Sequence, residues 1–342
     1  MNRIKHLVDL NASSSTSFLN QALDRSLYRS QHPTEIAVLK CMDGRLHLPI
    51  ITQTPLGIIR PFRNLGGRFN LGWAHFQTTL NEWVSYAISR ARPCLVLVTY
   101  HFSRGDAHRG CRGFDYNTDA ALLEMATLKQ QISTVFKGQA VTSIVCGIET
   151  DLDALILHGE NGERVDLSEL NETASSAELK DLIKRLYPSM PEQVQTDFLP
   201  LLAGNLKHIK EIRASNRPNS EVEHKEWMIG IGSGFDWLHE INAAFLVGPY
   251  SPDITGPIKT AAILLQDNIV SGRVNGADGL VLMTSAAYRK PVGPDRQLAI
   301  EKTKFLSAYA RDVIEAHTPD LLKHLEVLTA VVDMNTRKLE IL

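Results

Sequence analysis

The stretch that decides the fold is Glu35-Ile-Ala-Val-Leu-Lys-Cys-Met-Asp-Gly-Arg45, an apolar run that ends at a cysteine. A short apolar run of this kind is typical of a buried strand, so Cys41 is expected at the C-terminal end of a strand. A second apolar run, Leu95-Val-Leu-Val-Thr99, leads directly into Tyr100 and His101. Ligands of open α/β sheets collect where parallel strands end. Cys41 and His101 are therefore expected at one edge of a sheet.

The surrounding sequence alternates strand-like and helix-like segments. Strands are expected at 57–67 and 140–148, and helical spacing of apolar residues covers 76–90 and 120–136. This alternation predicts an α/β fold with a mostly parallel central sheet.

The same pattern returns after a polar, helix-prone segment, 168–225, that we expect to be broken at Pro188, Pro191 and Pro200. The repeated pairs are 226–232 with 35–41, 279–284 with 94–99, 297–315 with the helix after Cys111, and 325–342 with 141–158. Ser285 and Ala286 stand where the first copy has Tyr100 and His101, and the second copy contains no cysteine. The chain is therefore expected to be internally duplicated, with a degenerate second copy that cannot hold a metal.

Composition excludes several classes of partner. The chain has 342 residues and a formal net charge of −2, so it carries no basic surface typical of nucleic-acid or anionic-membrane binding. No apolar run reaches the roughly 20 residues that span a bilayer, and the first residues lack the apolar core of a signal peptide. The four cysteines are therefore expected to be reduced in the cytoplasm. Cys94 and Cys146 are expected to act as small apolar residues within strands.

Cys41, His101 and Cys111 are the candidate metal ligands. Thiolate and imidazole ligands suit zinc, and three protein ligands leave one position open, as a catalytic zinc site requires. Such a zinc ion lowers the pKa of its water to about 7 and so provides hydroxide at neutral pH. Asp43 could orient that hydroxide or swing in as a fourth ligand, and Arg45 could hold Asp43 bidentately and keep it off the metal.

Together these motifs resemble the β-class carbonic anhydrases over roughly residues 35–160. The matching elements are Cys41-x-Asp43-x-Arg45, the turn Arg63-Asn64-x-Gly66, and a histidine followed by Cys111-Arg-Gly113. The resemblance implies one zinc ion per chain, held by Cys, His and Cys. It also implies reversible hydration of CO2 to bicarbonate and a proton by metal-bound hydroxide, with Asp43 orienting the nucleophile and Arg45 positioning Asp43.

Two histidines compete for the second ligand position. His108-Arg-Gly-Cys111 has the His-x-x-Cys spacing of ordinary β-class enzymes. In that family, however, the histidine comes directly off the strand, which is the place of His101. The carboxysome shell carbonic anhydrases, a duplicated branch, carry an insertion between His and Cys. We therefore favour His101 and place His108, the alternative, on the inserted loop.

The duplication also resembles that shell branch, in which one metal-bearing and one metal-free domain share a chain. The domains are expected to be a helical N-terminal lead-in (1–34), a zinc-bearing catalytic domain (35–167), a helical linker (168–225) and a degenerate metal-free domain (226–342). The second copy would supply the wall that a partner subunit supplies in other β-class enzymes, making each chain a pseudo-dimer, and such chains are expected to form a homo-oligomer. Because the long extra N-terminal region of the branch is not seen, the cytoplasm is the expected location and the carboxysome the alternative.

Other readings of the sequence stay open. The same scaffold could hydrolyse COS or CS2, or could be a catalytically silent zinc- or bicarbonate-responsive module. Phe62, Leu65 and Phe69 are candidate walls of the substrate pocket. The acidic turn Thr150-Asp-Leu-Asp153 is expected to be solvated. The later histidines form no recognisable cluster in the sequence: His158, His208, His224, His239, His317 and His324.

Overall fold

The computed structural model describes residues 2–342, which divide into two compact units. The first-copy unit comprises residues 24–41 and 46–223; the second-copy unit comprises the residues up to 23, then 42–45 and 224–342. Residues 42–45, which directly follow Cys41, thus belong to the second-copy unit. The boundaries of the four domains expected from the sequence stay a prediction.

The first-copy unit is built on a six-stranded sheet of order β2-β1-β3-β4-β5-β6. Its strands are β1 (Glu35–Cys41), β2 (Ile59–Asn64), β3 (Cys94–Phe102), β4 (Val141–Glu149), β5 (Ala154–His158) and β6 (Arg164–Asp166). The first four run parallel, and β5 and β6 are antiparallel additions at one edge. The residues of β1 and β3 are buried almost throughout, as is typical of a parallel strand covered on both faces.

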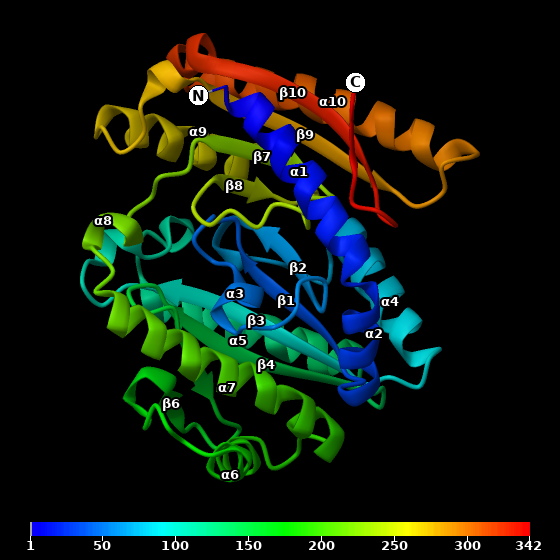
Figure 1. The fold of residues 1–342 in the computed structure, drawn as a ribbon, viewed down its shortest axis with the longest axis vertical. Coiled ribbons are helices and arrows are strands. Elements are labelled where there is room, and N and C mark those ends of the chain that lie inside the picture. Colours follow the sequence, from blue (N-terminus) through cyan, green and yellow to red (C-terminus); the bar gives the residue numbers. More distant parts are fainter. Residues whose placement is uncertain (1) are drawn as a thin grey trace. The chain divides into compact units, whose positions relative to one another are not determined.

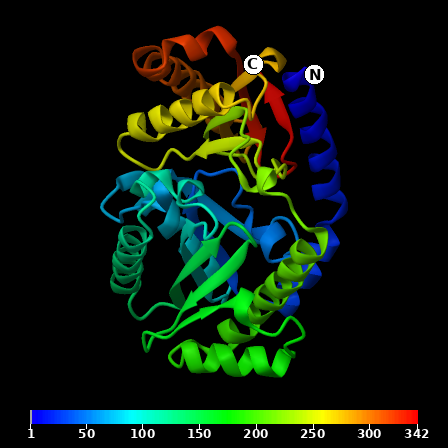
Figure 2. The ribbon, with the colours of Figure 1, turned by 90° about the vertical axis from the view of Figure 1, so that its left-hand side faces the viewer.

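Helices cover both faces of this sheet. Figure 2 shows α5 (Thr118–Val135) on one face and α7 (Glu192–Ser215) on the other. The other helices of this part of the chain are α2 (Ala22–Gln31), α3 (Leu48–Ile51), α4 (Ala74–Ile88), α6 (Ser176–Leu186) and α8 (Asn219–Val222). The expected break at Pro200 is wrong, because α7 continues through that proline; Pro191, by contrast, caps the start of α7.

The second-copy unit repeats this topology with a five-stranded sheet of order β11-β10-β9-β7-β8 (Figure 1). Its strands are β7 (Met228–Gly232), β8 (Ala244–Val247), β9 (Leu280–Tyr288), β10 (Leu325–Asp333) and β11 (Leu339–Ile341). As in the first copy, four strands are parallel and the next one along is antiparallel. The helices α9 (Thr255–Val270) and α10 (Pro294–His317) pack against it. The predicted duplicated, mostly parallel α/β fold is confirmed.

Strand register shows which residues of the second copy stand in the places of Cys41 and His101. In the first copy Leu39 pairs with Val98, so the same register puts Cys41 level with Tyr100 two residues later. In the second copy Gly232 pairs with Ser285. With the strands matched as the sequence predicts, Gly232 takes the place of Cys41 and the buried Ala286 takes that of His101. Neither residue has a side chain that can bind a metal.

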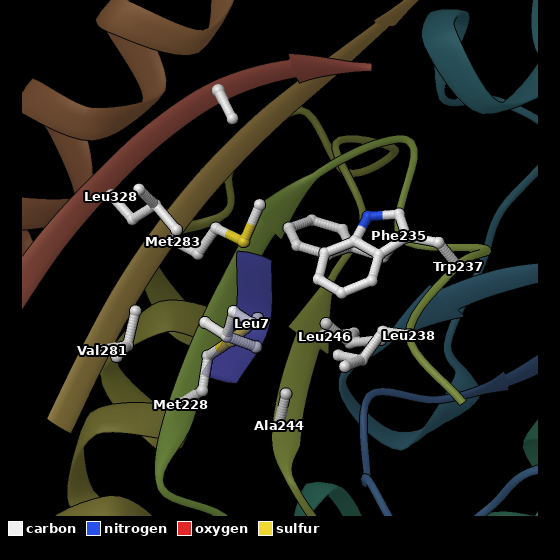
Figure 3. Close-up of a cluster of buried hydrophobic side chains, with 11 residues drawn as sticks. Leu7, Met228, Phe235, Trp237, Leu238, Ala244, Leu246, Val281, Met283 and Leu328 are labelled. Carbon is white, nitrogen blue, oxygen red and sulfur yellow. The ribbon is translucent and has the colours of Figure 1, made fainter. Parts of the chain in front are cut away.

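The N-terminal helix α1 (Arg3–Asn20) completes the second-copy core. Its Leu7 is fully buried in a cluster that includes Met228, Trp237 and Met283 (Figure 3). Asn11 donates to the Arg337 carbonyl and accepts from the Leu339 amide, which ties the helix to β11 beside it (Figure 2). The expected helical lead-in is therefore a packed part of this core.

Within residues 2–342, no helix is long and apolar enough to cross a membrane.

Candidate metal centre

Three segments of the first-copy unit bring the predicted ligands together. Cys41 is the last residue of β1, His101 lies one residue before the end of β3, and Cys111 directly precedes a short 3-10 helix (Arg112–Phe114). Because β1 and β3 are adjacent and parallel, their C-terminal ends meet at the same edge. The candidate ligand atoms of the three residues lie within 4.8 Å of one another, and all three residues are buried.

The two sulfur atoms have the separation that a shared metal ion requires. Cys41 Sγ and Cys111 Sγ are 3.9 Å apart, and neither cysteine forms a disulfide. Two thiolates about 2.3 Å from one tetrahedral zinc ion lie about 3.8 Å apart, whereas a disulfide bond is about 2.05 Å long. The donor set of two sulfurs and one imidazole, at this spacing, fits zinc.

His108, the alternative ligand, lies elsewhere in the loop. It lies in a 3-10 helix (Ala107–Arg109), and its side chain is 83% exposed. Its Nδ1 lies 3.3 Å from Oδ1 of Asp106, the residue that precedes this helix. The group formed with Cys41 and Cys111 contains His101 and not His108. This arrangement favours His101 as the ligand.

The Gly66-Gly67 turn supports both cysteines through close backbone contacts. Gly67 has φ +67°, and a Cβ there would lie 2.9 Å from the Thr99 carbonyl oxygen and 3.4 Å from the Cys41 amide nitrogen. A Cβ on Gly113 would lie 2.8 Å from the backbone of Gly66. Only glycine allows these approaches at both positions. The turn therefore braces the end of β1 and the segment that follows Cys111.

The loop between His101 and Cys111 is anchored to Asp151. Ser103 Oγ donates to this carboxylate at 2.8 Å, the Gly105 amide donates at 2.7 Å, and Arg109 forms an ion pair at 3.4 Å. Burial by itself would raise the pKa of Asp151, but the hydrogen bonds from Gly105 and Ser103 act together with the charge of Arg109 and other contacts to hold the pKa below its ordinary value. An ionised Asp151 thus fixes the loop that sets the spacing of the candidate ligands His101 and Cys111.

The pKa of Glu149, at the end of β4, is shifted in the direction opposite to that of Asp151. It is buried, and this burial raises its pKa, with the nearby Asp151 charge acting in the same direction. Its carboxyl group accepts hydrogen bonds from the amides of Arg104, Asp151 and Leu152. The carboxyl groups of Asp151 and Glu149 therefore connect the loop that follows β3 to the turn that follows β4.

The expectation that the 150–153 turn is solvated is wrong at Asp153. Asp153 is buried and binds Arg217 at 2.9 Å and His208 Nε2 at 3.1 Å. These contacts have no local signal in the sequence, because the partners follow more than 50 residues later in the chain. Asp153 thus connects this turn to α7 through His208 and to the segment after α7 through Arg217.

Asp43 and Arg45 form a bidentate pair within the second-copy unit. Asp43 Oδ2 accepts from Arg45 Nη2 at 2.6 Å, and Asp43 Oδ1 accepts from Arg45 Nε at 3.0 Å and from the Arg45 amide at 2.9 Å. Both side chains are buried. Because both carboxylate oxygens bind the guanidinium, Asp43 is held in the state expected to keep it away from a metal ion.

His224 and Glu226 join this pair, and sequence reasoning missed both. His224 Nε2 lies 3.1 Å from Arg45 Nη2, and His224 Nδ1 lies 3.0 Å from a carboxylate oxygen of Glu226. Both residues are buried. His-x-Glu within a loop is a weak signal, so only the fold could show that these residues meet the Asp-x-Arg motif.

The remaining cysteines behave as expected for buried apolar residues. Burial raises the pKa of Cys94 and of Cys146 to about 12, which leaves both thiols protonated and unreactive near neutral pH. Among the candidate pocket residues, Phe62 and Phe69 both pack against Phe76 of α4, with ring centroids 5.9 and 4.7 Å from it. Leu65 lies beside Gly113, close in sequence to Cys111.

Comparison with known proteins agrees with the resemblance seen in the motifs. Residues 27–190 match the family model of the carboxysome shell carbonic anhydrase catalytic domain. This segment contains Cys41, Asp43, Arg45, His101 and Cys111.

Curated relatives match a larger part of the chain. It is 24% identical over 257 residues to a carboxysome shell carbonic anhydrase of Prochlorococcus marinus (strain MIT 9313), covering 64% of this chain and 49% of the relative. The corresponding protein of Hydrogenovibrio crunogenus is 25% identical over 251 residues, covering 61% of this chain and 46% of the relative. That of Parasynechococcus marenigrum is 26% identical over 243 residues, covering 61% and 41%. The chain thus spans less than half the length of these relatives. The expected similarity to the duplicated shell branch is confirmed.

Proposed function

We propose that this protein is a zinc-dependent carbonic anhydrase that hydrates CO2 reversibly to bicarbonate and a proton. The observation that carries the proposal is the 3.9 Å separation of Cys41 Sγ and Cys111 Sγ, with His101 in the same buried group. Two soft sulfur donors and one imidazole leave one position of a tetrahedral zinc ion open. The similarity to carboxysome shell carbonic anhydrases supports the same reaction.

Cys41, His101 and Cys111 would hold the zinc ion. When bound, zinc lowers the pKa of a water molecule to about 7, which makes hydroxide available near neutral pH. The protein residues then have separate tasks. Asp43, two residues after Cys41, would orient this hydroxide by accepting a hydrogen bond from it. Arg45 holds the Asp43 carboxylate in place through its two hydrogen bonds.

The second copy has no metal ligands at the matching strand ends, so we expect one zinc ion per chain. It would act as a built-in partner domain, which makes each chain a pseudo-dimer that assembles further into a homo-oligomer. Since the relatives are named for the carboxysome shell, we extend carboxysome association to this protein as part of the proposal.

Two other functions fit the same donors. Hydrolysis of COS or CS2 would need the same zinc and nucleophile, and a closed zinc- or bicarbonate-responsive module would need Asp43 on the metal. The bidentate Asp43–Arg45 pair favours an open, catalytic site over the closed module.

Stopped-flow CO2 hydration from mildly acidic to alkaline pH, with zinc quantified, tests the proposal. Wild type should hydrate CO2 with about one zinc per chain, and Cys111→Ser should lose both. Cys94→Ser is the matched control, since Cys94 lies in the same sheet and should keep zinc and activity. Wild type that binds zinc but hydrates no CO2 at any pH would refute the proposal, and COS and CS2 would then be tested as substrates.

A further inference from the structure

Glu226 and His224 form a buried chain of contacts that ends on Arg45. Glu226 is fully buried and His224 is 8% exposed. Nδ1 of His224 lies 3.1 and 3.0 Å from the two carboxylate oxygens of Glu226, and Nε2 lies 3.1 Å from Arg45 Nη2. The four residues that make these contacts all belong to the second-copy unit: Glu226, His224, Arg45 and Asp43.

The chemistry of the end groups determines which imidazole nitrogen carries the proton. A guanidinium can only donate hydrogen bonds, so Nε2 of His224 must accept. A carboxylate can only accept, so Nδ1 must donate to Glu226. Both contacts are satisfied only by the neutral Nδ1–H tautomer. A doubly protonated ring would point an N–H at the Arg45 guanidinium.

Glu226 also fixes the backbone between Asp43 and Arg45. Its Oε1 accepts from the Gly44 amide at 3.1 Å. The neighbouring residues Met42 and Gly44 accept at their carbonyls from the amides of Leu246 and Asn242, both at 2.9 Å. A Cβ at Gly44 would lie 2.6 Å from the Ala244 carbonyl oxygen, so β8 passes directly against this segment. Within the second-copy unit, Asn242, Leu246 and the side chain of Glu226 thus hold the backbone of residues 42–44 in place.

The same cluster could be mistaken for a second metal site. Candidate ligand atoms of Asp43, His224 and Glu226 lie within 4.8 Å of one another. However, Arg45 donates to both carboxylate oxygens of Asp43 and contacts His224 Nε2. The guanidinium thus already occupies, as the positively charged partner, the place that a metal ion would take among these groups.

We propose that Glu226 is a positioning residue: through His224 and the Gly44 amide it holds Arg45, and so Asp43, in the geometry that CO2 hydration needs. This inference rests on the proposed function. It gives the second-copy unit a specific task, because the acid and the imidazole that order the Asp43–Arg45 pair both belong to that unit. Neither residue needs to touch the substrate.

The test compares Glu226→Ala with Glu226→Gln, in which the amide oxygen can still accept from His224 Nδ1 and Gly44. The matched control is Glu240→Gln, the partly exposed partner of His6 in the same unit, which should match wild type in every measurement. Zinc content is measured for each variant. Glu226→Ala should lower kcat about 10- to 100-fold, the usual effect of removing an outer partner, with KM nearly unchanged and zinc retained. Glu226→Gln should recover most of the loss.

Two NMR signals make the test independent of turnover. In wild type, imidazole 15N shifts should give His224 as the Nδ1–H tautomer, and the Arg45 Nε–H proton should be slow to exchange. Glu226→Ala should abolish both signals and Glu226→Gln should keep them; His224→Gln and Arg45→Lys identify the signals. If Glu226→Ala does not fold, Glu226→Asp, which keeps the charge but shortens the reach, should show the same changes to a smaller degree.

Some outcomes would overturn the inference. An Nε2–H tautomer in wild type, or unchanged kcat and Arg45 signal in folded Glu226→Ala, would refute positioning by Glu226. A second zinc ion per chain that disappears in Glu226→Ala would make the cluster a metal site instead. Wild type without CO2 hydration would refute the proposed function, whereas the NMR signals would still decide whether Glu226 orders Arg45.

Discussion

Cys41 and Cys111 are 70 residues apart in the chain, yet their sulfur atoms lie 3.9 Å apart in a buried site. The distance matches two ligands of one tetrahedral zinc ion and is far too long for a disulfide. The fold thus brings the two sulfur atoms to a separation that fits a shared zinc ion.

Cysteine alkylation should divide the four thiols into two classes. In the zinc-loaded protein we expect none to react quickly, and after chelation Cys41 and Cys111 should react first. Cys94 and Cys146 should stay unmodified until the protein unfolds, because burial raises the pKa of each to about 12 and the thiolate is the reactive form. Mass spectrometry of peptides from timed reactions measures this order. Rapid labelling of Cys94 in folded protein would contradict it.

Replacing the two candidate histidines should give different zinc contents. His101→Asn should lose most of the bound zinc, since a buried ligand position is removed. His108→Asn should keep about one zinc per chain, because His108 is exposed and pairs with Asp106. Metal analysis after gel filtration measures the zinc content of both variants. Zinc loss in His108→Asn with retention in His101→Asn would reverse the assignment.

The Gly67 turn should be sensitive to a single methyl group. Gly67→Ala should destabilise the fold by more than the roughly 1–2 kcal/mol that a left-handed alanine costs, because its Cβ would also lie 2.9 Å from the Thr99 carbonyl oxygen. Gly138→Ala is the matched control: Gly138 also has positive φ, but no atom lies within 4 Å of its Cβ position. Urea unfolding of both variants measures the difference. Equal losses would show that the close approach near Cys41 has no energetic weight.

Asp151 should slow the release of zinc. Asp151→Asn weakens the bonds from Ser103, Gly105 and Arg109 that hold the loop between His101 and Cys111. We expect a chelator to extract zinc about 10-fold faster, at the lower end of effects from outer partners. Asp106→Asn changes the same charge on an exposed part of the same loop and should release zinc at the wild-type rate. Identical rates for the two variants would remove the anchoring role of Asp151.

Acidification should destabilise the protein partly through His158. Burial, with Arg164 nearby, lowers the pKa of His158 to about 4 from 6.5, and its Nε2 lies 2.9 Å from the hydroxyl of Tyr100. The pKa of Tyr100 is raised to about 12 by burial, so the hydroxyl is the donor and the neutral imidazole accepts. The folded state binds fewer protons than the unfolded state between about pH 6.5 and 4. Stability from this group is therefore complete above pH 6.5 and decreases as the pH falls through that window.

Unfolding curves across this window test the His158 contribution. Wild type should lose more stability between pH 6.5 and 4 than His158→Gln, which cannot gain the proton. His239→Gln replaces a histidine of the second-copy unit and serves as the control. A His158→Gln slope equal to that of wild type would refute the contribution.

Local sequence patterns predicted most of the architecture and the meeting of Cys41, His101 and Cys111 in one buried group. The apolar runs before Cys41 and His101 identify two parallel strands, and the alternation around them identifies the α/β class. The repeat of those runs after residue 225 identified the second copy, whose sheet has the same strand order. These signals are readable because they lie within single elements.

Contacts between distant segments could not be predicted in this way. Nothing near Asp153 in the sequence indicates His208 or Arg217, and nothing near Arg45 indicates His224. Pro200 misled in the opposite direction, because packing of α7 against the sheet outweighs the lost backbone hydrogen bond. Partner choice for buried charges depends on tertiary structure, and a single sequence does not encode it in local spacing.

X-ray absorption at the zinc edge of the purified, zinc-loaded protein measures the ligands of the bound ion directly. We expect about two sulfur neighbours at roughly 2.3 Å and two nitrogen or oxygen neighbours at roughly 2.0 Å, with one sulfur lost in any zinc retained by Cys111→Ser. A shell of oxygen and nitrogen alone, or of four sulfurs, would contradict a catalytic zinc site built from Cys41, His101 and Cys111.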